Sequence, residues 1–373
     1  MRYQQFTTGV TPLIALLPLM ALWSTGCAHK HVSTEPAITP LPEIHVAAEK
    51  QNGGQVIDAY DAATLFERGN RLLGAERFAD AIETYRRLEN EFPRSPYLAP
   101  TLYNLGICLD KTGQYDAAVD TYQKLLRGFP DFNDVKNARF RLADSLEALA
   151  RWDDLIGTLD TLSAQTPDLT PVDKVEIHAK KGAALIETNQ PALAKIELEQ
   201  AVRVFTRAEG VSPTAPDFYY SMAQFKLAEL THAQMRQVSL PADDKALEAI
   251  LEKKCRLLLD AQYLYTQVIR IGHPHWCAAA AYRTGALYHH LWEDMLAAKP
   301  PTGLTDSEQE VYMEVLRKRI TILLKKAVKQ WRRTLAFAMR LNLDNAWIAQ
   351  TRQDLKEIES VLEIEEQVGA DLP

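Results

Sequence analysis

The sequence is poor in cysteine and carries no excess of positive charge. Four cysteines occur in 373 residues, and Cys27 stands apart near the N-terminus. The other three, Cys108, Cys255 and Cys277, are too few for a disulfide framework. The formal net charge is −7, so the chain lacks the basic character of proteins that bind nucleic acid. We therefore exclude nucleic acid as a partner.

Motifs for catalysis and for metal binding are lacking as well. The sequence holds no phosphate-binding glycine loop, zinc-protease helix motif or nucleophile elbow. His289 with Glu293, or His290 with Asp294, has the i, i+4 spacing of a helix face, but two ligands are rarely a metal site. We therefore predict that the protein is not an enzyme and uses no cofactor or metal.

The apolar run near the N-terminus is too short for a comfortable membrane-spanning helix. It covers Val10 to Trp23, follows the basic Arg2, and is interrupted by Pro12 and Pro18. A basic start, a short apolar core and small residues before a cleavage point are typical of a secretory signal.

Residues 24–27, Ser-Thr-Gly-Cys, resemble the end of a bacterial lipoprotein signal. The resemblance implies that residues 1–26 are a signal peptide and that Cys27 is acylated. Ala28 is not the aspartate that retains such proteins in the inner membrane, which favours the periplasmic face of the outer membrane. An ordinary secretory signal with an incidental cysteine is the alternative. The proline- and glycine-containing segment that follows, to residue 60, predicts a flexible tether.

What the sequence does contain is a repeat with a period of 37 residues. A fixed period of this length is typical of stacked supersecondary units. No stretch has the alternating pattern of a strand. The aligned positions are Gly69, Gly106 and Ala143; Phe78, Tyr115 and Trp152; Ala81, Ala118 and Leu155; Tyr85, Tyr122 and Leu159; and Pro93, Pro130 and Pro167.

Each repeat unit predicts two helices joined by a short turn. In the second unit, apolar residues from Leu102 to Leu109 recur at helical spacing, a turn follows at 112–114, and a second apolar face begins at Tyr115. Phe129-Pro130 ends the unit, because proline cannot continue a helix. A small residue is needed at position 106, where the two helices cross closely.

This pattern resembles the tetratricopeptide repeat. Gly106, Ala118, Tyr122 and Pro130 match the four characteristic positions of that family, and the first unit matches them too. The resemblance implies an all-α solenoid of about six helical hairpins with a capping C-terminal helix. Residues 61–168 hold three regular units, and residues 169–373 form a degenerate region of longer helices.

The resemblance also implies a protein-binding groove lined by the first helix of each unit. Three aromatic residues fall in register there and could anchor an extended peptide. The alternative is that these aromatics pack between adjacent repeats. The groove positions are Phe66, Tyr103 and Phe140; Asn70, Ile107 and Asp144; and Asp110, Lys111 and Glu147.

A second candidate surface is the basic helix expected from about residue 307 to 341. No acidic residue interrupts 315–342. We expect the acidic final helix to neutralise this helix in part, or else an anionic membrane, polymer or protein to bind it. The cations opposite its apolar seam are Lys318, Lys325, Lys329 and Arg332.

Together these features resemble periplasmic tetratricopeptide lipoproteins. The segments 271–276, 282–285 and 301–305 also resemble the tail of repeat proteins in bacterial gliding-motility and related envelope complexes. We predict a lipid-anchored scaffold that binds envelope proteins or extended peptides in an assembly, motility or secretion machine. An anionic envelope polymer as ligand of the basic helix, or a regulatory subunit of an envelope enzyme, are the alternatives.

Overall fold

A computed structural model describes residues 43–51, 54–208, 218–241 and 244–370. The chain divides into two units, residues 1–44 and 45–373. Only residues 43 and 44 of the first unit are described, so the predicted signal peptide and Cys27 lie outside the described residues. All other described residues belong to the second unit.

The second unit consists mainly of thirteen helices among its described residues. The first six are short: α1 (Ala62–Gly74), α2 (Phe78–Glu91), α3 (Leu98–Lys111), α4 (Tyr115–Gly128), α5 (Val135–Ala148) and α6 (Trp152–Gln165). The later ones are longer: α7 (Pro171–Glu187), α8 (Pro191–Arg207), α9 (Phe218–Gln237), α10 (Asp244–Ile271), α11 (Pro274–Leu296), α12 (Asp306–Arg340) and α13 (Ala346–Ala370).

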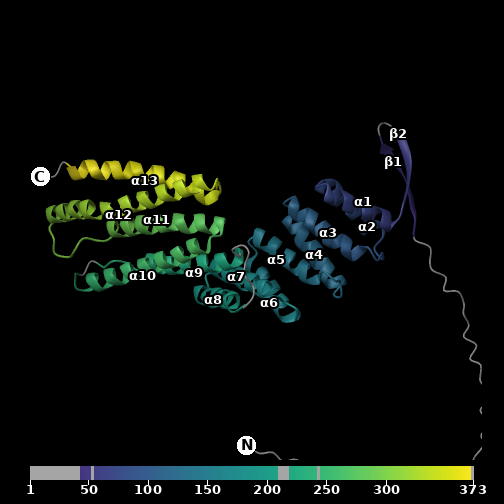
Figure 1. The fold of residues 1–373 in the computed structure, drawn as a ribbon, viewed down its shortest axis with the longest axis horizontal. Coiled ribbons are helices and arrows are strands. Elements are labelled where there is room, and N and C mark those ends of the chain that lie inside the picture. Colours follow the sequence, from purple (N-terminus) through teal and green to yellow (C-terminus); the bar gives the residue numbers. More distant parts are fainter. Residues whose placement is uncertain (1–42, 52–53, 209–217, 242–243, 371–373) are drawn as a thin grey trace, which may run out of the picture. The chain divides into compact units, whose positions relative to one another are not determined.

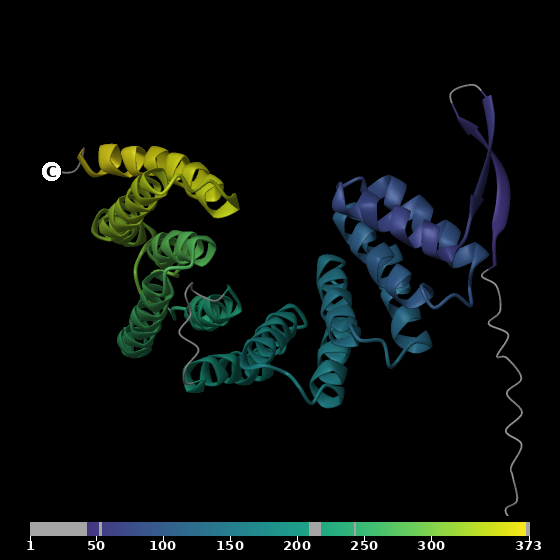
Figure 2. The ribbon, with the colours of Figure 1, turned by 45° about the vertical axis from the view of Figure 1, so that its right-hand side comes forward.

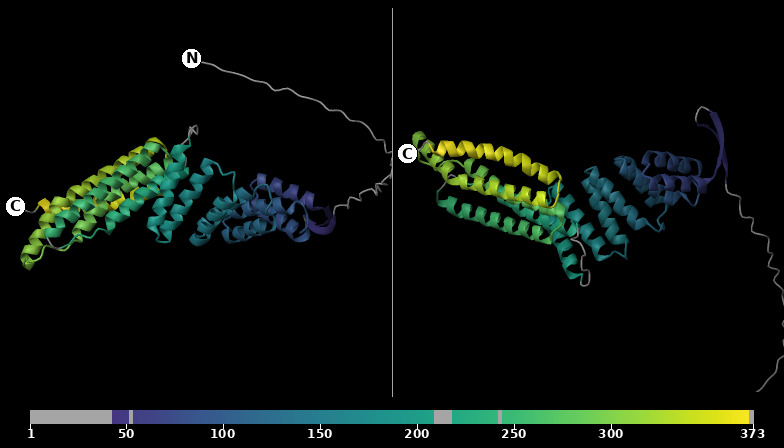
Figure 3. Two further views of the ribbon diagram at one scale, coloured as in Figure 1. Left: turned by 90° about the horizontal axis from the view of Figure 1, so that it is seen from below. Right: turned by 45° about the horizontal axis from the view of Figure 1, so that its top comes forward.

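Consecutive helices pair into hairpins that stack on one another (Figure 1). Every helix packs on the next one in the chain, and α3, α5, α9, α11 and α13 each also contact the helix two places before them. The long helices α10 to α13 lie side by side (Figure 3). This arrangement confirms the predicted all-α solenoid of six hairpins followed by one final helix.

Small residues allow the two helices of a hairpin to cross closely. A Cβ added to Gly106 would lie 2.4 Å from Cε1 of Tyr122, which is fully buried. The sixth hairpin uses the same contact, because a Cβ on Gly285 would lie 2.3 Å from Nε1 of Trp331. The repeat therefore persists structurally where its sequence spacing has stretched.

The prediction that the chain contains no strands is wrong. Residues expected to belong to the tether form strands β1 (His45–Gln51) and β2 (Gly54–Tyr60). They pair antiparallel, from His45 opposite Tyr60 to Gln51 opposite Gly54. The two residues between the strands are Asn52 and Gly53, the dipeptide most typical of a tight hairpin connection.

The base of this hairpin is fixed to the first helical unit (Figure 2). The hydroxyl of Tyr60 donates a hydrogen bond to Glu91 over 2.6 Å, and the Arg87 guanidinium lies 3.9 Å from the centre of the Tyr60 ring. The ring of His45 lies 4.6 Å from that of Phe92. Tyr60 is 5% exposed and begins the hydrophobic core of the regular units.

Candidate protein-binding faces

The predicted groove aromatics lie on the first helices α1, α3 and α5, and we call the surface of these helices the first-helix face. Phe66, Tyr103 and Phe140 are all half-buried. The ring of Phe66 lies 5.3 Å from that of Tyr97, and the ring of Tyr103 lies 6.0 Å from that of Phe132. Two of the aromatics thus pack against residues that lead into the next unit, while each of the three residues stays partly exposed.

Asn70 connects three helices of the first two units. Its Oδ1 accepts hydrogen bonds from the Tyr85 hydroxyl over 2.7 Å and from Nδ2 of Asn104 over 2.9 Å. Tyr85 belongs to the second helix of the same unit, and Asn104 to the first helix of the next. Asn70, one of the predicted groove positions, therefore uses its side-chain oxygen for two hydrogen bonds within the protein.

Asp110 makes the same kind of connection one unit later. Its carboxylate accepts hydrogen bonds from the Tyr122 hydroxyl over 2.8 Å and from Oγ of Ser145 over 2.6 Å. Burial raises the pKa of Asp110, although these two hydrogen bonds oppose the shift. On the same face, Ile107 is half-buried and Lys111 is exposed, so both are within reach of a partner.

Asp144 and Glu147 converge on a lysine that the sequence analysis did not single out. Nζ of Lys180 lies 2.7 Å from Oδ1 of Asp144 and 2.6 Å from Oε2 of Glu147. Lys180 is 3% exposed. Burial alone would lower its pKa, but the two carboxylates outweigh burial and raise it. In the sequence Lys180 lies between Ala179 and Lys181, and this context does not mark it as a buried residue.

Glu176 and Tyr219 complete this cluster at the meeting of α5, α7 and α9. Burial raises the pKa of Glu176 to about 7, while Lys180 and a hydrogen bond from Tyr219 oppose the shift. Nζ of Lys180 lies 5.4 Å from the centre of the Tyr219 ring. The carboxylates of Asp144 and Glu147 are 44% and 37% exposed, so they can still accept hydrogen bonds from a basic partner.

The two histidines of these pairs have different neighbours. Nδ1 of His290 lies 2.9 Å from Nε2 of His232, and His289 lies 3.7 Å from Glu293. Burial lowers the pKa of His232 to about 3 and that of His290 to about 4. Within the described ranges, no three histidine, cysteine, aspartate or glutamate side chains gather as metal ligands.

The basic helix corresponds to α12. Some of its cations pair with glutamates of α13, and others have no ion-pair partner among the described residues. Lys318, Lys325, Lys329 and Arg332 are all exposed. Nη2 of Arg332 lies 2.6 Å from Oε1 of Glu359, on the acidic helix α13. Arg317 of α12 likewise reaches a glutamate of α13 over 3.2 Å. Lys318 and Lys329 form no ion pair with any residue that the structure describes, so α13 neutralises α12 only in part.

Comparisons with known proteins agree with this architecture. Residues 60–131 match the tetratricopeptide repeat family, which covers the first two units. A comparison with curated protein sequences gave no match. None of the described helices has the length and apolar character needed to cross a membrane.

Several solved structures are similar to parts of this chain at low sequence identity. The C-terminal part of a repeat protein from Cytophaga hutchinsonii is 11% identical, with a TM-score of 0.44 over 81% of this chain and 98% of that chain. A tetratricopeptide repeat protein from Parabacteroides merdae is 14% identical, with a TM-score of 0.39 over 80% and 98%. PilF from Pseudomonas aeruginosa is 14% identical, with a TM-score of 0.40 over 69% and 91%.

The repeat match and the hairpin stack together identify the general role of the regular units. Stacked helical hairpins form an extended surface in which each unit contacts only its neighbours. Tetratricopeptide repeats of this kind are scaffolds for protein–protein interaction.

Proposed function

We propose that the chain is a lipid-anchored periplasmic scaffold that holds envelope proteins through the first-helix face. The observation that carries this proposal is the partial exposure of the aromatic residues Phe66 and Tyr103, on consecutive first helices. Rigid aromatic side chains of this kind contribute large contact areas at protein interfaces. The expected lipid anchor and the resemblance to envelope-complex proteins support the cellular setting.

The polar residues of the face narrow the kind of segment that it accepts. Asn70 and Asp110 hold the repeats together, so a partner gains little from them. Lys111 is exposed, and the carboxylates of Asp144 and Glu147 are partly exposed. The face suits an extended segment with apolar side chains over the aromatics and a basic residue near Asp144.

Site-specific photo-crosslinking in cells tests the face directly. A benzophenone amino acid placed at Ile107 or at Lys111 should capture a discrete partner on irradiation. The same residue at the exposed positions Glu83 or Asp120, on the second helices α2 and α4, is the matched control. Capture from the second helices alone, or no capture from either set, would reject the first-helix face.

The proposed anchor has its own test. A Cys27→Ser variant should leave the membrane fraction and should no longer incorporate a radiolabelled fatty acid. Its folded fraction, measured by circular dichroism, should stay the same, because residue 27 precedes the helical unit. Continued sedimentation of the variant with membranes would contradict acylation at this cysteine.

A further inference from the structure

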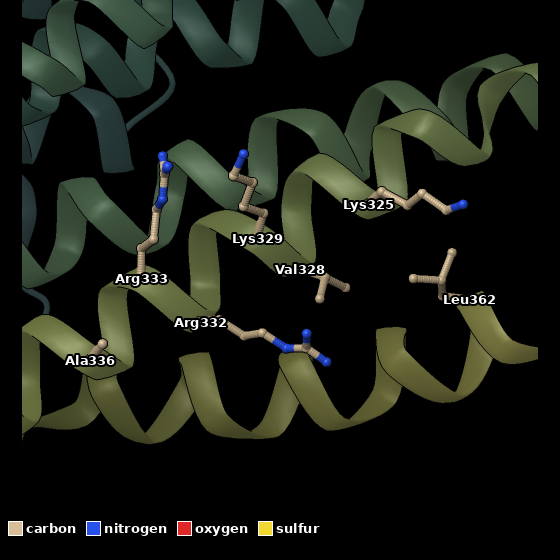
Figure 4. A pocket seen from close by; sticks show the side chains of 7 residues that line it. All are labelled: Lys325, Val328, Lys329, Arg332, Arg333, Ala336 and Leu362. Carbon is tan, nitrogen blue, oxygen red and sulfur yellow. The ribbon is translucent and has the colours of Figure 1, made fainter.

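A groove runs along α12 where α13 packs against it, and we call it the α12–α13 groove (Figure 4). Its volume is about 550 Å³. Its lining combines apolar side chains with exposed cations and holds no carboxylate. The lining residues are Val328, Ala336 and Leu362, and Lys325, Lys329, Arg332 and Arg333.

The positive charge of this groove is only partly neutralised within the chain. Arg332 projects toward α13 (Figure 4) and pairs there with Glu359. Lys329 and Arg333 have no ion-pair partner in the part of the chain that the structure describes. Cations four residues apart on a helix lie about 6 Å apart along its axis. Their mutual repulsion makes an anionic neighbour favourable.

The lining continues as an exposed stripe toward the N-terminus of α12. At about 100° per residue, Val315, Lys318 and Ile322 fall within about 40° of Lys329 around the helix axis. Val315 is 42% exposed and Ile322 is 54% exposed. From Val315 to Arg333 the stripe is about 27 Å long, and it intersperses apolar with cationic side chains. Stripes of mixed apolar and charged residues are typical of helix–helix interfaces.

Two other grooves of this protein are each bordered by three helices. Leu142 of α5 lines a groove that α4 and α6 border, and Leu185 of α7 lines one that α6 and α8 border. In both, a first helix lies between two second helices. Helix α13 packs on α12 and α11, as a first helix does, but no further helix follows it among the described residues. Among the described residues, two helices border the α12–α13 groove.

We propose that the α12–α13 groove binds an acidic amphipathic helix of a partner protein, which lies beside α13 as a second helix lies beside α5 and α7 in their grooves. Carboxylates spaced four residues apart face Lys325, Lys329 and Arg333, as the flanking charges of a coiled coil do. The apolar side of the partner helix packs on Leu362 and on the exposed Val315 and Ile322. About 18 residues match the length of the stripe. This surface lies apart from the first-helix face, so the inference goes beyond the proposed function.

Binding of a designed peptide to the full chain tests the proposal. The probe is a fluorescein-labelled 18-residue helix with leucine on one side and glutamate at four-residue spacing beside it. Fluorescence anisotropy should show saturable binding that weakens as salt is added, because salt screens charge pairs at a surface. Lys329→Glu combined with Arg333→Glu should weaken binding by roughly tenfold or more, since two attractions become repulsions.

Two further variants separate the groove from general charge attraction. Arg86→Glu with Lys174→Glu makes the same change of net charge at exposed positions on α2 and α7, and should leave binding unchanged. Ala336→Trp fills the groove without changing any charge, and should also reduce affinity. Equal loss in the control pair, or full binding by the Ala336→Trp variant, would overturn the proposal.

Two other probes distinguish the helical protein partner from other anions. A peptide of the same composition with a central proline should bind at least tenfold more weakly, because proline breaks its helix. Vesicles of phosphatidylglycerol and phosphatidylcholine should not bind through Lys329 and Arg333. Vesicle binding that depends on these cations, without binding of the helical peptide, would assign the groove to a bilayer surface instead.

Discussion

Lys180 of α7 reaches Asp144 of α5, with 2.7 Å between Nζ and Oδ1. The same ammonium also pairs with Glu147. At most junctions, successive first helices lie close to each other. The approach is weakest between α5 and α7, which both pack on α6. A charge cluster around the buried Lys180 therefore connects the regular units to the longer helices. Breaking it should affect this junction more than the rest of the solenoid.

Replacing Lys180 by methionine should lower the free energy of unfolding by about 1–3 kcal/mol. Methionine fills a similar volume but leaves Asp144 and Glu147 close together without their counter-ion. Hydrogen exchange should accelerate most in α5 and α7. Adding Asp144→Asn and Glu147→Gln to the variant should recover part of the loss, because the residual repulsion disappears. An unchanged melting temperature for Lys180→Met would show that the cluster contributes no stability.

Glu176 should make the protein less stable as the pH rises. Its pKa is about 7 in the folded protein, against an ordinary value of 4.5. The folded state therefore holds the proton of Glu176 more tightly than the unfolded state does. The resulting contribution to the free energy of unfolding is complete below pH 4.5 and is lost as the pH rises through 7. The loss is at most about 3 kcal/mol. The free energy of unfolding of Glu176→Gln minus that of the wild type, measured with urea, should be larger at pH 8 than at pH 5.

His232 and His290 also make stability depend on pH, so the pH profile of Glu176→Gln must be compared with that of the wild type. Burial lowers the pKa values of His232 and His290, so their contribution is present above pH 6.5 and lost as the pH falls. These residues oppose the trend of Glu176 between pH 4.5 and 6.5, but they contribute equally to wild type and variant. Glu83→Gln, at an exposed position on α2, is the control. Parallel pH profiles for Glu176→Gln and wild type would contradict the assignment.

Gly285 should not tolerate even one added carbon. A Cβ there would lie 2.3 Å from Nε1 of Trp331, which is fully buried and donates a hydrogen bond to the backbone carbonyl of Tyr282 over 2.9 Å. Gly285→Ala should cost about 1–3 kcal/mol through overpacking. Gly157→Ala, in an open part of α6, should be neutral or stabilising by about 0.5–1 kcal/mol. Equal melting temperatures for the two variants would reject the contact.

The sequence predicted the hairpins well because helix crossing leaves a strict pattern. Gly106 with Tyr122, and Gly285 with Trp331, mark the same contact in different hairpins. The roles of the groove residues were harder to predict. A polar residue such as Asn70 can face a partner or bond to the next repeat, and spacing alone does not distinguish the two.

Two other features depended on information that the helical period does not carry. The Lys180 cluster forms between α5 and α7, about 35 residues apart, and no periodic pattern marks an ion pair between units. The hairpin β1–β2 was missed because its signal is one dipeptide, Asn52-Gly53, rather than a clear alternation of apolar residues.

The hairpin β1–β2 should protect the first helical unit through Tyr60. This residue is almost fully buried against the regular core and bonds to Glu91 at the end of α2. Tyr60→Ala removes that bond and most of the buried ring, so it should cost about 2–4 kcal/mol. Because each unit of a solenoid contacts only its neighbours, hydrogen exchange should rise in α1 and α2 and stay unchanged in α11 and α12.

A conservative variant separates the hydrogen bond of Tyr60 from its packing. Tyr60→Phe keeps the ring against Phe92 and under Arg87 and removes only the hydroxyl that donates to Glu91, whose carboxylate still pairs with Arg87, so it should cost only about 0.5–1.5 kcal/mol. If Tyr60→Phe and Tyr60→Ala lowered stability equally, the hydrogen bond rather than the buried ring would hold the hairpin in place. If neither variant changed exchange in α1 and α2, the hairpin would not stabilise the end of the solenoid.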